Sequence, residues 1–90
     1  MNRDAAQTVA ILALSYLARD QDRLERFMGS TGLASDDLAQ AAANPEILGG
    51  VLDYLLGDEK LLLDFTADAG IAPEEPALAR RALPGFMPQM

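Results

Sequence analysis

Two seven-residue segments decide the fold of this chain: LSYLARD at residues 14–20 and LDYLLGD at residues 52–58. The longer segments Val9–Gln40 and Ile47–Leu78 align without a gap at an offset of 38 residues. Nine of the 32 aligned pairs are identical. Chance alignment of this composition gives roughly three identities. We therefore predict an internal repeat, repeat one at 9–40 and repeat two at 47–78, with the two halves packed about an approximate twofold axis.

Helix-capping signals divide both halves in the same way. Asn44-Pro45 is an N-cap residue followed by proline at the first helical position, and it predicts a helix that reaches Leu56. No segment alternates with the period of two that a half-buried strand needs. The sequence predicts an all-α, compact bundle of about six short helices, arranged as two similar three-helix halves. The other expected helix starts are Asp4, Asp20, Ser35, Asp58 and Pro73.

We expect one domain over 1–90, with 84–90 as a C-terminal tail, since 90 residues suffice for one core. The expected core consists of large apolar residues that recur in both halves. These are Leu14, Leu17, Leu24, Phe27, Leu52, Leu55, Leu62 and Phe65.

Composition excludes several classes of function. The chain has no cysteine and no histidine, so thiol nucleophiles, disulfides and the commonest zinc ligands and general bases are missing. The net charge is −7, and ten acids lie between residues 36 and 79 with Lys60 as the only base. Such a surface repels phosphate backbones and anionic lipid, so we expect neither nucleic acid nor membrane as a partner.

The apolar run at 9–18 is too short for a membrane span. A signal peptide is the alternative, but the run has a twin in repeat two, so we expect a cytoplasmic protein.

The differences between the repeats indicate two candidate sites. Gly49 and Gly50 replace Ile11 and Leu12 of repeat one, and each glycine in a helix interior costs about 1 kcal/mol relative to alanine. We expect either a close helix crossing, with the first helix packed on bare backbone, or a groove for a peptide or ligand. The second site is the run of three leucines at residues 61–63. These side chains cover more of the helix surface than a single core-facing side needs. Its cover is either the chain itself or a partner, and the expected interface comprises Leu56, Leu61, Leu63, Phe86 and Met87.

Carboxylates are the only abundant chemical groups, and their pattern does not indicate an active site. Asp64 and Asp68 share one helix face, but two carboxylates do not make a specific calcium or magnesium site. The doublets 36–37 and 74–75 fall in helix first turns, where the helix dipole explains them. We expect no metal, no cofactor and no enzyme activity.

Three segments carry a family resemblance: residues 32–38 (GLASDDL), 44–52 (NPEILGGVL) and 62–65 (LLDF). The chain resembles a group of short alphaproteobacterial helical proteins classed as a domain of unknown function. That resemblance implies a small bacterial helical protein and supplies no catalytic residues.

The leading functional hypothesis is a cytoplasmic protein-interaction module or homodimer, with a partner that has an apolar or basic surface. The alternative is a binder of a small apolar ligand between the two halves, near the two glycines. An enzyme that uses carboxylates is a distant third.

Overall fold

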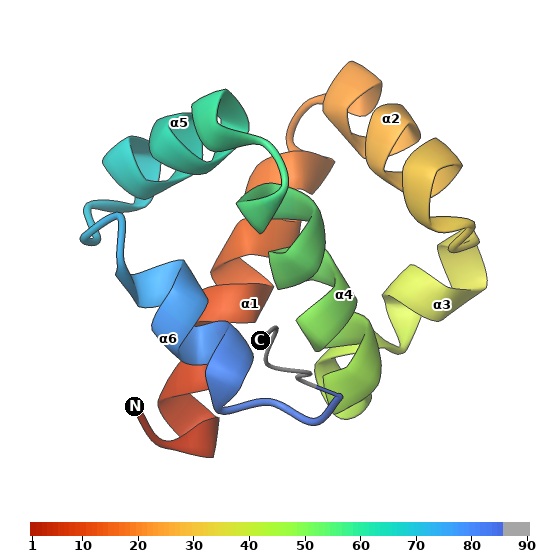
Figure 1. Cartoon of the computed structure of the whole chain (residues 1–90). Coiled ribbons are helices and arrows are strands. Elements are labelled where there is room, and N and C mark those ends of the chain that lie inside the picture. The colour runs from red at the N-terminus through yellow and green to blue at the C-terminus, as the bar shows by residue number, and fades with distance from the viewer. Residues whose placement is uncertain (86–90) are drawn as a thin grey trace.

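The computed structural model describes residues 1–85, and every regular element in that range is helical (Figure 1). The predicted all-α fold is therefore confirmed for this part of the chain. The elements are α1 (Arg3–Ala18), α2 (Gln21–Thr31), α3 (Ser35–Ala39), a 3-10 turn η1 (Ala41–Ala43), α4 (Pro45–Leu56), α5 (Glu59–Ala69) and α6 (Glu75–Arg81).

Side-chain caps begin four of these helices. Asp20 caps α2, Asn44 caps α4 and Asp58 caps α5, each accepting hydrogen bonds from backbone N–H groups of the first turn at 2.9–3.4 Å. These three starts agree with the prediction. The first helix begins earlier than predicted, because the Asn2 side chain, not that of Asp4, accepts the capping bond, from the Ala5 N–H at 2.7 Å.

The third helix also begins one residue earlier than Ser35 would set it. Ala34 is its N-cap residue, and the Asp37 carboxylate reaches back to accept the Ala34 N–H at 2.8 Å. Glu75 does the same for the Ala72 N–H, at the same distance, near the start of α6. The second acid of each doublet, Asp37 or Glu75, therefore accepts a capping bond, and the Ser35 hydroxyl does not.

The core lies where α1, α4 and α6 meet. Figure 1 shows α1 and α4 crossing the middle of the molecule, with α2 and α5 as two arms at one end. Small residues at Ala6, Ala10 and Ala13 are fully buried and let neighbouring helices approach α1 closely. Five predicted core residues are fully buried, namely Leu17, Phe27, Leu52, Leu55 and Phe65, whereas Leu14, Leu24 and Leu62 are half-buried against that core.

Two aromatic pairs join the halves reciprocally. Tyr16 packs on Phe65 with ring centroids 5.6 Å apart, and Phe27 packs on Tyr54 at 5.1 Å. Tyr16 and Tyr54 are equivalent in the predicted repeat, as are Phe27 and Phe65, so each half supplies one ring to each pair. The bounds of α2 and α5 also differ by 38 residues at both ends, and Gly32 and Gly70 end them at φ values of 75° and 70°. These features support the duplication, which remains our hypothesis.

Candidate functional site

The leucine run of α5 divides between two environments. Leu61 and Leu62 are half-buried and pack against the core, whereas Leu63 is 45% exposed. Because successive helix residues turn by about 100°, Leu61 and Leu63 point about 200° apart and cannot share one flat interface. Leu56, at the end of α4, is half-buried. The remaining predicted interface residues, Phe86 and Met87, lie outside the described residues.

The nearest atoms to the Cβ position of Gly49 come from α6, not from the first helix that we expected to pack there. A Cβ at Gly49 would lie 3.0 Å from Nη1 and 3.1 Å from Cζ of Arg80. Those distances are shorter than ordinary van der Waals contact, so the missing side chain leaves room for the guanidinium group. A cation rather than an apolar side chain therefore explains this glycine.

Arg80 connects three parts of the fold and is only 7% exposed. Its Nε donates to Asp53 Oδ1 at 2.6 Å, and its Nη1 donates to the carbonyl oxygens of Pro84 at 3.1 Å and Leu83 at 3.5 Å. Buried charges persist when they are paired and hydrogen-bonded, and Arg80 has both an ion-pair partner in Asp53 and carbonyl acceptors. Arg80 thus fastens α6 and the turn at Gly85 to α4. Sequence reasoning missed this residue, because nothing local distinguishes it from the exposed Arg81.

Gly50, one residue further along α4, has a different environment. Apart from its chain neighbours and the backbone of its own helix, no atom lies within 4 Å of the position that its Cβ would occupy. The glycine instead lines a surface pocket of about 230 Å³ where α2, the α2–α3 turn and α4 converge. The other lining residues are Thr31, Leu33, Asn44, Glu46 and Ile47. We call this pocket, with Gly50, the Gly50 pocket.

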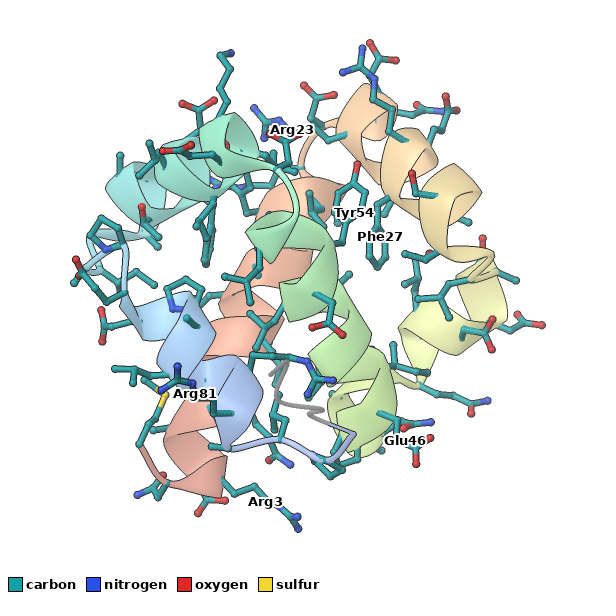
Figure 2. All side chains as sticks on the ribbon, in the orientation of Figure 1. Arg3, Arg23, Phe27, Glu46, Tyr54 and Arg81 are labelled. Carbon is teal, nitrogen blue, oxygen red and sulfur yellow. The ribbon has the colours of Figure 1, made fainter. Side chains whose placement is uncertain are left out.

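Most polar groups at the Gly50 pocket already have partners. The Thr31 hydroxyl donates to the Phe27 carbonyl oxygen at 2.8 Å, and the Asn44 side chain caps α4. The remaining lining is the apolar surface of Leu33 and Ile47 together with the bare backbone at Gly50. Glu46 adds a carboxylate in the first turn of α4; Figure 2 shows its side chain near the start of that helix. The pocket can therefore hold a small apolar group next to a negative charge.

Two further observations concern the described residues as a whole. In residues 1–85, no three carboxylates lie close enough together to hold a metal ion. Among the helices of that range, none has the length and hydropathy that crossing a membrane requires.

Comparison with curated proteins and with solved structures finds no match to this chain. A family model does match, over residues 3–86, and its description is "Protein of unknown function (DUF3572)". This match covers nearly the whole chain, and the chain belongs to the DUF3572 family.

Proposed function

We propose that this protein is a protein-interaction module, and that the Gly50 pocket takes one apolar side chain of a partner protein. The observation that carries the proposal is the open space above Gly50, beside the apolar surfaces of Leu33 and Ile47. Filled pockets of this kind contribute much of the binding energy at protein interfaces.

The size of the pocket favours a side chain over a free ligand. Small-molecule sites usually enclose about 300–1,000 Å³ and are lined mainly by apolar groups. The Gly50 pocket, at about 230 Å³, is smaller than that range. A larger cavity of about 560 Å³ lies at the junction of α1, α2 and α3, but its lining includes Arg19, Gln21, Glu25 and Ser35. Its polar lining is less suited to an apolar ligand.

Charge complementarity indicates the chemistry of the partner. Glu46 lines the pocket and places its carboxylate in the first turn of α4. The chain as a whole carries a net charge of −7. Opposite potentials accelerate encounter and discriminate against wrong partners. We therefore expect a partner segment in which a basic residue lies next to the apolar side chain that enters the pocket.

Two leucine substitutions of helix glycines test this proposal. Gly50→Leu fills the pocket, whereas Gly29→Leu introduces the same side chain at a glycine of α2 that has nothing within 4 Å of its Cβ position. Both changes remove a helix glycine, so both variants should fold. We expect peptides selected from a random library on the wild-type protein to carry an apolar residue beside a basic one. These peptides should bind Gly29→Leu normally and Gly50→Leu at least about tenfold more weakly.

Two results would contradict the proposal. Equal binding to both variants would place the peptide site elsewhere on the surface. A small apolar compound that copurifies with the wild type, detected by native mass spectrometry and absent from Gly50→Leu, would favour the ligand-binding alternative instead.

We also propose a cytoplasmic location. The support is that α1, which contains most of the apolar run at 9–18, supplies six buried residues and thus belongs to the folded domain. Fractionation of cells that express the tagged protein tests this directly, and recovery in an exported fraction would overturn it.

A further inference from the structure

We propose that the cleft between the first turns of α2 and α5 binds a phosphate-type oxyanion. This cleft has a volume of about 200 Å³, and its lining includes Arg23 and Arg26 from α2 and Lys60 from α5. Figure 2 shows Arg23 between the two helices. The site lies away from the Gly50 pocket and is independent of the proposed function.

The distribution of basic residues sets this cleft apart. The chain has seven bases against fourteen acids. Arg80 is paired with Asp53, and Arg19 is paired with Asp68 on α5. Three of the remaining five bases line the one cleft. The cleft therefore holds three bases against two carboxylates, which is a local excess of positive charge on an otherwise acidic protein.

Arg23 is held in place before any ligand arrives. Its guanidinium carbon lies 4.3 Å from the centroid of the Tyr16 ring, within the range of a cation–π contact. Its Nη1 also donates to the Tyr16 carbonyl oxygen at 3.4 Å. Ordering this side chain in the free protein reduces the conformational entropy that binding would otherwise cost.

Arg26 supplies the second guanidinium group. It lies three residues after Arg23, so both side chains extend from neighbouring positions on one face of α2. Among residues 1–85, no hydrogen bond or ion pair engages the Arg26 side chain. A guanidinium fork matches the geometry of phosphate oxygens and can donate two parallel hydrogen bonds.

Two carboxylates also line the cleft, but both are engaged by α5 itself. Asp58 caps the helix by accepting the Leu61 N–H at 3.1 Å, and Asp64 Oδ2 lies 3.8 Å from Lys60 Nζ. Their charge opposes an anion placed against α5. The arrangement therefore favours a compact ligand that lies on the α2 wall, held by the two arginines, with Lys60 reaching across.

Titration of the full-length protein with inorganic phosphate, followed by amide NMR at constant ionic strength, tests the site. We expect saturable shifts at residues 22–26 and 58–64. Arg26→Gln should weaken binding about tenfold, as expected for the loss of a charged hydrogen bond. The matched control is Arg81→Gln, which removes another exposed arginine, outside the cleft, and should leave the affinity unchanged.

Acetate, at the same ionic strength, forms the second arm of the experiment. Weaker binding of acetate than of phosphate supports the assignment to phosphate-type anions, and acetate binding as tight as that of phosphate would overturn it. Shifts that do not saturate, or an equal loss of affinity in Arg26→Gln and Arg81→Gln, would mean that the response is unspecific screening. Because both arginines are exposed, circular dichroism should show an unchanged fold in both variants.

Discussion

The adjacent glycines of α4 should respond to alanine with opposite changes in stability. Alanine at either position gains up to about 1 kcal/mol from helix propensity. At Gly50 nothing opposes that gain, because no atom lies within 4 Å of the new Cβ. At Gly49 the new methyl group would lie 3.0 Å from Nη1 of Arg80 and must displace the guanidinium group.

The displacement has a cost that can be bounded from the contacts of Arg80. Its guanidinium donates to Asp53 at 2.6 Å and to the Pro84 carbonyl oxygen at 3.1 Å, so it cannot move without weakening both. A hydrogen bond to a charged group contributes about 1.5–3 kcal/mol, and the exposure of Asp53 argues for the lower end. Gly49→Ala should therefore destabilise the protein by about 0.5–2 kcal/mol, whereas Gly50→Ala stabilises it by up to about 1 kcal/mol.

Urea and thermal unfolding of the two variants measure this difference. For a domain of this size, 1 kcal/mol corresponds to about 4–8 °C in Tm, so the variants should differ by at least about 6 °C. In an Arg80→Met background the guanidinium group is gone, and Gly49→Ala should then become stabilising, which a double-mutant cycle detects. A Gly49→Ala protein as stable as Gly50→Ala, with no coupling to Arg80, would refute the explanation of this glycine.

Three further predictions concern the rest of the molecule. Phe65→Ala should destabilise by about 3–5 kcal/mol, and so should Phe27→Ala, since both rings are fully buried; an unchanged urea midpoint would contradict the assigned core. Arg19→Gln should change stability by less than about 1 kcal/mol, because its ion pair with Asp68 is exposed; a larger loss by the same assay would show that the pair is stronger than surface pairs usually are. Leu63→Glu should reduce self-association, measured by light scattering, more than it reduces stability. A wild-type protein that stays monomeric at high concentration would contradict the hypothesis that Leu63 lies at a self-association interface.

Local signals in the sequence predicted most of the helix boundaries. Asp20, Asn44 and Asp58 each satisfy backbone N–H groups two or three residues ahead, so their role depends only on near neighbours. The predicted cap at Ser35 is wrong, because the helix begins one residue earlier, at the N-cap Ala34, whose N–H donates to the Asp37 carboxylate.

The candidate sites were harder to predict, because they depend on contacts between distant residues. The sequence treats Gly49 and Gly50 as one feature, but one glycine accommodates Arg80, 31 positions away, and the other lines a pocket. Nothing in the order of residues tells which helix will cross a glycine. The cleft at Arg23 and Lys60 has the same origin, since only the fold brings α2 and α5 together.

The reciprocal aromatic pairs have a consequence for how the chain can be divided. Tyr16 from the first half completes the environment of Phe65 in the second, and Tyr54 returns the same contact to Phe27. A fragment that ends in the η1 turn would leave both of its own rings without their partners. Such a fragment would lack the packing needed to fold alone, whereas the two fragments mixed together could restore both pairs. We therefore expect the two halves to unfold together as one cooperative unit, although the sequence divides near the middle.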